Sequence, residues 1–176
     1  MRRGCISWVL AMAGVAVIVM LFGLIFIYSG IYSVAATYPD PAPVAWIFDK
    51  TLEHSVQHHA SGIPIPSLDD PAMVKAGFRL YAKACEGCHE APGVEEDKVT
   101  KSFNPEPPKL EESANDWKAN ELFWISKNGV RMTAMPAWGS TFSDKQIWSI
   151  VAAARKLAAT KPGEYASLSR RSSAKK

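Results

Sequence analysis

Cysteine is scarce in this sequence, and so is any excess of one charge. Only three of the 176 residues are cysteine, and only Cys85 and Cys88 lie close together, which excludes a disulfide framework. The formal net charge is +3, and residues 71–160 contain 12 basic and 11 acidic side chains. A balance this even gives no electrostatic sign of nucleic-acid binding and no docking surface of a single charge. We therefore expect no nucleic-acid partner.

Charged side chains are absent from residues 4–39. The most apolar part, Ile6–Tyr28, would be about 35 Å long as a helix, enough to cross a hydrocarbon core of about 30 Å. A cleaved secretory signal is the alternative, because the sequence SVAA at Ser33–Ala36 resembles a cleavage site. The apolar core of a signal sequence is shorter, at about 7 to 15 residues. We therefore predict one uncleaved transmembrane helix over residues 6–28.

The two ends of this apolar segment differ in charge. Arg2 and Arg3 precede it, whereas no charged residue follows it until Asp40. The positive-inside rule then places residues 1–5 in the cytoplasm and the rest of the chain on the other side of the membrane. Cys5 precedes the apolar segment, so it does not fit a lipoprotein processing site, and we interpret it as a small interfacial residue.

Residues 29–69 are predicted to be a linker. Prolines at positions 39, 41 and 43 disfavour regular structure at its start. Ile47, Leu52 and Val56 then recur at roughly helical spacing, which indicates a short amphipathic helix with Trp46 near the lipid headgroups. His54 and His58 could share a face of that helix, as metal ligands do. No third ligand is evident, so we expect them to contact solvent or headgroups.

A small all-α domain is predicted over residues 70–160. Asp70 followed by Pro71 is a helix start, Asn120 can cap a second helix, and Ser143 with Gln146 forms a capping box for a third. Two long loops separate these helices, and no segment shows a strand pattern. A domain this short of regular structure is marginal without a bound group to fill its core. Residues 161–176 are polar and end in basic side chains, so we predict a disordered basic tail.

The sequence KACEGCHEAPG allows three interpretations. A redox dithiol belongs at a strand-to-helix junction, and no strand pattern precedes it. A structural zinc site needs about four ligands, and no further cysteine follows. Covalent haem attachment accounts for all the residues, because Cys85 and Cys88 would form thioethers with the two vinyl groups and His89 would be the proximal iron ligand. In bacteria this attachment takes place outside the cytoplasm, where the predicted topology puts the motif.

A six-coordinate haem iron needs a second axial ligand. The sequence GVRMTAMPAWG offers Met132 and Met135. Pro136 restricts the residue before it to an extended conformation, which favours Met135 as the ligand and leaves Met132 to a packing role.

Together, Tyr81, CEGCH, PPKL, GVRMTAMPAW and SDKQIWSIVAAARKL resemble the class I c-type cytochromes, over most of residues 71–160. This resemblance implies that Gly77 and Tyr81 meet Trp148 where the first and last helices cross. It also implies that the Pro108 carbonyl accepts a hydrogen bond from the His89 ring. The aromatic side chains Phe123, Trp124 and Trp138 are expected to line the haem pocket. The sequence YSGIYSVAATYPDP resembles a membrane-anchored subgroup found near respiratory oxidases and dehydrogenases.

The function expected from these features is electron transfer. A single haem c held by His89 and Met135 has both axial positions filled, which suits Fe(II)/Fe(III) cycling and disfavours oxygen chemistry. We expect a carrier without enzymatic activity, anchored in a bacterial inner membrane with its haem domain in the periplasm. Its partners would be a donor and an acceptor in the membrane, such as an oxidase, a dehydrogenase or another cytochrome. The alternatives are a dedicated cytochrome subunit of a larger oxidoreductase, and a haem enzyme or gas sensor in which Met135 is labile.

Overall fold

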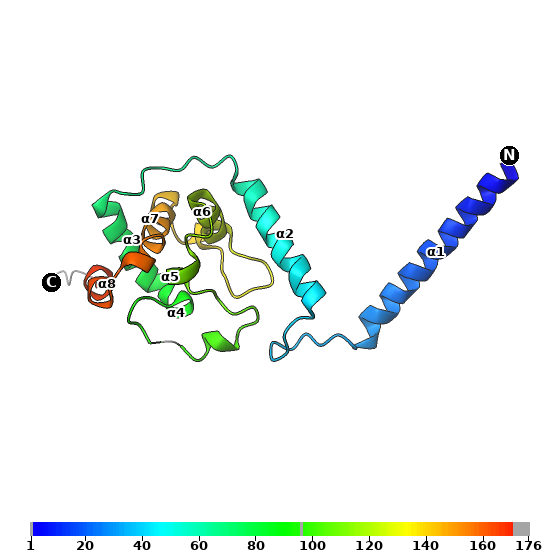
Figure 1. Ribbon diagram of the computed structural model, residues 1–176, viewed down its shortest axis with the longest axis horizontal. Coiled ribbons are helices and arrows are strands. Elements are labelled where there is room, and N and C mark those ends of the chain that lie inside the picture. Colours follow the sequence, from blue (N-terminus) through cyan, green and yellow to red (C-terminus); the bar gives the residue numbers. More distant parts are fainter. Residues whose placement is uncertain (1, 96, 171–176) are drawn as a thin grey trace. The chain divides into compact units, whose positions relative to one another are not determined.

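The computed structural model describes residues 2–95 and 97–170. The chain divides into two compact units, of which the first ends at Tyr38 and the second begins at Pro39. The first unit contains α1 (Arg2–Ser29), which Gly30 follows with a φ of 66°, in the left-handed region that commonly ends a helix (Figure 1). Its segment Ile6–Ser29 is long and apolar enough to cross a membrane, and none of that segment is buried against protein. The predicted apolar helix is therefore present.

The second unit begins with α2 (Ala42–Ala60), which is longer than the amphipathic helix predicted there. Pro43 lies in its first turn, where proline is tolerated because the missing N–H has no partner within the helix. Val56 and Ala60 are buried, and the Asn120 side-chain amide donates a hydrogen bond of 2.8 Å to the Ala60 carbonyl. The C-terminal half of α2 therefore packs against the domain instead of lying free in a linker.

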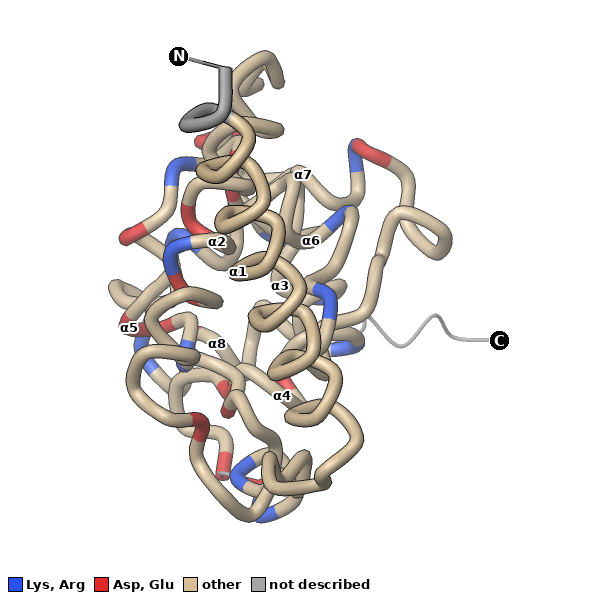
Figure 2. The backbone as a smooth tube through the Cα atoms, turned by 90° about the vertical axis from the view of Figure 1, so that its right-hand side faces the viewer, with Lys and Arg blue, Asp and Glu red and all other residues tan. Residues whose placement is uncertain are grey.

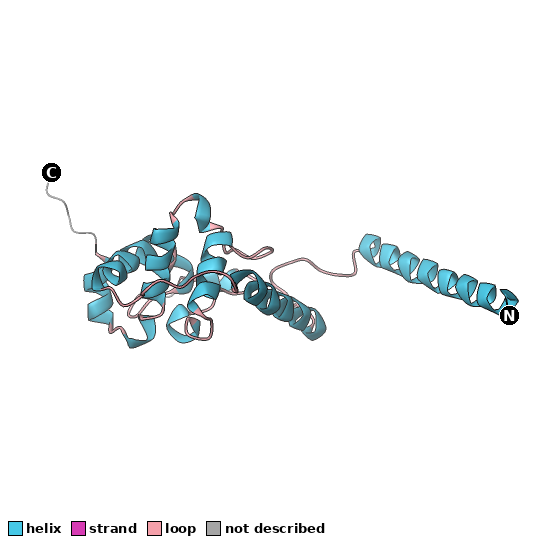
Figure 3. Cartoon of the chain, turned by 90° about the horizontal axis from the view of Figure 1, so that it is seen from above, coloured by secondary structure: helices cyan, strands magenta, loops and turns pink. Residues whose placement is uncertain are grey.

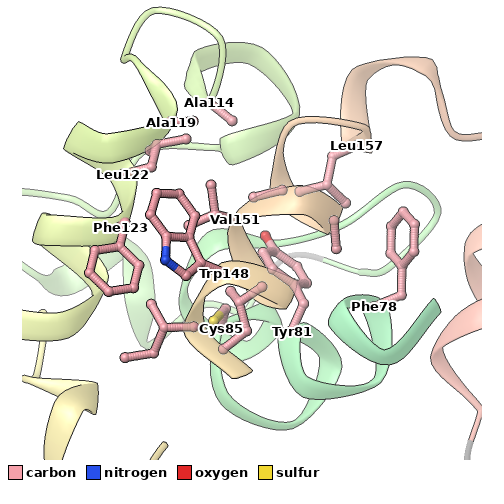
Figure 4. Packing of buried hydrophobic residues seen from close by; sticks show 14 of the residues in the cluster. Phe78, Tyr81, Cys85, Ala114, Ala119, Leu122, Phe123, Trp148, Val151 and Leu157 are labelled. Atoms are coloured by element: carbon pink, nitrogen blue, oxygen red, sulfur yellow. The ribbon is translucent and has the colours of Figure 1, made fainter. Parts of the chain in front are cut away.

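The centre of the domain is the crossing of α3 (Pro71–Ala84) and α7 (Asp144–Ala154). A Cβ atom added to Gly77 would lie 1.8 Å from the Ser149 carbonyl oxygen, so only glycine permits this approach. The close helix crossing expected at Gly77 is present, and the atoms nearest to the added Cβ belong to Ser149, the neighbour of Trp148, and to Ala153. The Trp148 ring stacks on Phe123 with centroids 4.3 Å apart (Figure 4).

Helix starts follow the predicted capping signals. The Asp70 carboxylate accepts a hydrogen bond of 3.0 Å from the Ala72 N–H at the start of α3. Ser143 and Gln146 form the capping box of α7, with the Ser143 N–H donating to the Gln146 side-chain oxygen at 2.9 Å. The helix expected to begin at Asn120 is α6 (Ala119–Asn128), and its cap is Lys118, so the prediction of Asn120 as the cap is wrong.

The two long loops contain short helical turns. These are α4 (Glu86–His89), η1 (Thr100–Ser102), α5 (Leu110–Ser113), η2 (Trp138–Ser140) and, after α7, η3 (Leu157–Ala159). Residues 2–95 and 97–170 contain helices and loops and no strand (Figure 3). The all-α prediction is confirmed.

The predicted disordered tail is wrong for its first half. Residues Pro162–Ser169 form α8, which packs on α3. Tyr165 is only 2% exposed, and its ring makes edge contacts with Phe78 and Tyr81 at centroid distances of 5.8 and 6.5 Å. The Tyr165 hydroxyl also donates a hydrogen bond to the Glu86 carboxylate. Burial of one aromatic side chain therefore outweighs the polar composition of this segment. The remainder of the predicted tail, residues 171–176, lies outside the described residues.

Candidate haem site

The two neighbouring cysteines lie where α3 passes into α4. Cys85 ends α3, with its N–H bonded to the Tyr81 carbonyl at 2.8 Å, and its own carbonyl accepts hydrogen bonds from Cys88 and His89 at 3.0 and 2.8 Å. This single turn places both sulfurs and the imidazole on one short helical segment. Cys85 is buried, Cys88 is half-buried, and neither forms a disulfide.

The burial of Cys85 disfavours a redox dithiol. Burial, and to a lesser degree the neighbouring Cys88, raise the pKa of Cys85 to about 12. A reactive dithiol needs a lowered thiol pKa, because the thiolate is the nucleophile. A zinc site is not supported either, because no group of three or more His, Cys, Asp or Glu side chains suited to a metal occurs among the described residues.

The His89 ring is oriented by a backbone carbonyl 19 residues further along the chain. Its Nδ1 lies 2.8 Å from the carbonyl oxygen of Pro108. A carbonyl oxygen only accepts hydrogen bonds, so Nδ1 carries the proton and Nε2 keeps a free lone pair. Burial lowers the pKa of His89 and the Pro108 bond partly offsets this effect, so the ring is held neutral. A neutral, oriented imidazole is the form that binds a metal.

Two further contacts fix the segments on either side of this hydrogen bond. Glu90 adopts a φ of 58°, and its carboxylate lies 3.1 Å from the Lys109 ammonium. The buried Tyr81 hydroxyl donates a hydrogen bond of 2.7 Å to the Glu90 carbonyl. Glu90 directly follows His89, and Lys109 directly follows Pro108. Their ion pair therefore joins the same two segments as the hydrogen bond between His89 and Pro108. Sequence reasoning missed Glu90 and Lys109, because charges 19 positions apart show no pattern.

The loop that contains Met135 is folded back on itself. The Val130 N–H bonds to the Met135 carbonyl at 3.2 Å, and the Thr133 hydroxyl accepts from the Met135 N–H at 3.1 Å while donating to the Val130 carbonyl at 2.8 Å. Gly129 has a φ of 68°, and a Cβ there would lie 2.8 Å from the Met135 carbonyl oxygen. These contacts therefore hold the backbone of Met135 in one place.

The two methionines of this loop differ in exposure. Met135 is half-buried, whereas Met132 is 78% exposed and adopts a φ of 60°. A side chain this exposed does not fit the packing role predicted for Met132, and a shielded iron ligand must be at least partly buried. The difference favours Met135 as the distal ligand.

The aromatic side chains expected around a haem are divided between two regions. Phe123 is buried against Trp148, and the Trp138 ring stacks on Phe142 with centroids 5.4 Å apart. Trp124 instead packs against His59 of α2, at 5.4 Å between ring centroids. The pocket role of Phe123 and Trp138 therefore stays a prediction, and the observed ring contact of Trp124 is with α2. His54 and His58 are exposed on α2.

These residues fit a covalently attached haem. They combine two thiols three residues apart, an adjacent imidazole held by Pro108, and a thioether on a loop fixed by Gly129 and Thr133. The crossed α3 and α7 helices and this arrangement fit a class I c-type cytochrome.

Residues 72–152 match the family described as cytochrome C oxidase, cbb3-type, subunit III. This segment is a cytochrome c domain, and with the apolar α1 the chain fits a membrane-anchored class I c-type cytochrome that takes part in electron transfer. The family implies haem c as the cofactor. No curated protein matches the chain. Both α2 and α8 lie outside the matched residues.

Proposed function

We propose that this protein is a membrane-anchored carrier of single electrons with one haem c, which works between respiratory redox partners. The observation that carries the proposal is the hydrogen bond of 2.8 Å between His89 Nδ1 and the Pro108 carbonyl. It leaves the second ring nitrogen available as an iron ligand directly beside Cys88. When bound, the haem would supply the Fe(II)/Fe(III) couple.

Each site residue has a distinct part in this proposal. Cys85 and Cys88 would hold the group covalently, and His89 and Met135 would be the two protein ligands of its iron. With both axial positions filled by protein, no open site remains for oxygen or substrate, and a Met/His pair favours a raised reduction potential. Pro108 keeps the imidazole in one tautomer and orientation, so both oxidation states meet the same ligand geometry.

The membrane anchor would confine the carrier to the surface of one membrane. α1 is the candidate single span, and we place the N-terminus in the cytoplasm and the haem domain in the periplasm of a bacterial inner membrane on the basis of Arg2 and Arg3. Tethering raises the effective concentration of the domain near partners in the same membrane, so tight docking is not required. Charges of both signs are interspersed over the domain (Figure 2), which agrees with short-lived contacts instead of one strongly charged interface.

A second candidate is a dedicated cytochrome subunit of a membrane oxidoreductase. The matched family is described as a subunit of a cbb3-type oxidase, and this description favours an oxidase complex as the partner. Purification in a mild detergent separates the two candidates. A carrier is recovered alone, and a subunit is recovered in a stable ratio with other chains.

Haem attachment is tested by denaturing electrophoresis and haem staining of the full chain purified from membranes. We expect one haem per chain that survives denaturation in the wild type and no retained haem when both cysteines are replaced (Cys85→Ala with Cys88→Ala). A Cys5→Ala variant is the matched control and should stain like the wild type. Covalent haem in the double variant would overturn the attachment site, and ready binding of carbon monoxide by the reduced wild type would overturn the carrier function.

A further inference from the structure

The N-terminal end of α2 exposes three successive large apolar side chains. Trp46, Ile47 and Phe48 are 63%, 53% and 49% exposed. They lie outside the residues matched by the cytochrome family and far along the chain from the haem-site residues. Neither the core of the domain nor electron transfer at the iron accounts for them.

The other end of the same helix is attached to the haem domain. Val56 and Ala60 are fully buried, and the Ala60 carbonyl accepts a hydrogen bond of 2.8 Å from Asn120 on α6. The His59 ring packs against Trp124, also on α6. A helix is stiff over this length, so the position of its exposed end is fixed relative to the haem domain.

The arrangement of the exposed residues favours a lipid surface over a protein partner. Successive residues on a helix point about 100° apart, so Trp46, Ile47 and Phe48 spread over about 200° of the helix circumference, which is wider than one flat face. A protein surface would cover one side of such an end, whereas a lipid layer surrounds it. Tryptophan and aliphatic side chains are also favoured at the level of the headgroups.

Charge and chain length agree with a position at the membrane. Between Gly4 and Phe48 the only charged residue is Asp40. The charged residues of α2 begin at Asp49 and Lys50, and the Lys50 ammonium pairs with the Glu53 carboxylate at 2.6 Å. The connecting residues 30–41 can span at most about 43 Å, so the start of α2 stays near the membrane surface that α1 would leave.

We propose that the end of α2 formed by Trp46, Ile47 and Phe48 inserts into the headgroup region of the membrane that α1 crosses. Because the opposite end of α2 is packed on α6, this second contact holds the haem domain in one orientation at the surface. The inference rests on the proposed anchoring by α1. It adds a second membrane contact that presents the same face of the domain to partners in that membrane.

The test uses the full haem-loaded chain, reconstituted into vesicles of phosphatidylethanolamine and phosphatidylglycerol. A nitroxide spin label is placed at Ile47→Cys, or at the exposed Gln57→Cys three turns further along as the matched control, each with Cys5→Ser. Collision of the label with oxygen, which partitions into lipid, is compared with collision with a water-soluble nickel chelate. Flotation of the vesicles reports separately whether the chain is anchored.

We expect a several-fold higher ratio of oxygen to nickel collisions at position 47 than at position 57. Adding Trp46→Ser with Phe48→Ser should lower the ratio at position 47 to that of the control, with flotation and the haem spectrum unchanged. If the chain floats and the label at position 47 is as water-accessible as that at 57, the inference is overturned and the anchored carrier stands. If the chain does not float, anchoring by α1 fails, and the inference that rests on it fails too.

Discussion

Replacing Gly77 with alanine should destabilise the domain, because a Cβ at this position would lie 1.8 Å from the Ser149 carbonyl oxygen and 2.9 Å from the Ala153 side chain. The nearest atoms belong to the backbone of α7, so they cannot turn aside as a flexible side chain does. Overpacking of this kind costs up to about 3 kcal/mol, and the better helix propensity of alanine offsets about 1 kcal/mol. The net loss is then about 2 kcal/mol, or about 8 to 16 °C in Tm for a domain near 100 residues.

The matched control for this change is Gly163→Ala. Gly163 lies in α8, and no atom lies within 4 Å of a Cβ placed there. Thermal unfolding of both holo variants, followed by far-ultraviolet circular dichroism, should show a lower Tm for Gly77→Ala and an unchanged or slightly higher Tm for Gly163→Ala. If Gly77→Ala melts together with the wild type, α3 and α7 do not cross as closely as described, and the reasoning is refuted.

Three other changes test the contacts around the site. Tyr165→Phe removes the hydrogen bond to Glu86 and should cost about 1 kcal/mol in urea unfolding, whereas Tyr165→Ala should cost about 3 to 5 kcal/mol because it also empties a buried site; equal costs would contradict a packing role for α8. Lys109→Met breaks a partly exposed ion pair with Glu90 and should cost no more than about 1 kcal/mol in the same assay; a larger loss would mean that the pair is essential to the loop. Burial raises the pKa of Tyr81, so this hydroxyl loses its proton at a lower pH in the unfolded chain than in the folded one. The free energy of unfolding should therefore fall as the pH rises above about 10. The fall should be smaller in Tyr81→Phe, and an identical fall would contradict the assignment to Tyr81.

The fold of the domain was largely predictable because its signals are local. Asp70 and the pair Ser143 with Gln146 fixed two helix starts through capping, and the glycine inside α3 indicated a close crossing. The identity of the crossing partner was not local. The resemblance named Trp148 at the crossing, and the atom nearest to the added Cβ is the carbonyl oxygen of its neighbour Ser149, while the Trp148 ring stacks on Phe123.

The misses arise where packing overrides composition. The segment after Thr160 is polar, yet Pro162 can begin a helix and Tyr165 fills a site between Phe78 and Tyr81. An isolated tyrosine three residues after a proline was the available signal. The docking of α2 was missed for a similar reason, because no sequence rule pairs Asn120 with a carbonyl 60 residues earlier.

The candidate site was predictable from the sequence because its motif for haem attachment is contiguous. Cys85, Cys88 and His89 share one helical turn, and the hydrogen bond between His89 and Pro108 is present as the family resemblance implied. Ligation of iron by Met135 stays a prediction, supported by its partial burial and by the exposure of Met132.

The most direct test of the central claim compares Met135→Ala with Met132→Ala in the purified full chain. The account predicts that Met135→Ala abolishes the weak absorption band between methionine sulfur and ferric iron and lowers the midpoint potential, because the ligand that favours the reduced state is gone. Met132→Ala should keep both the band and the potential of the wild type. An unchanged band and potential in Met135→Ala would contradict His/Met ligation and, with it, the saturated iron on which the carrier function depends.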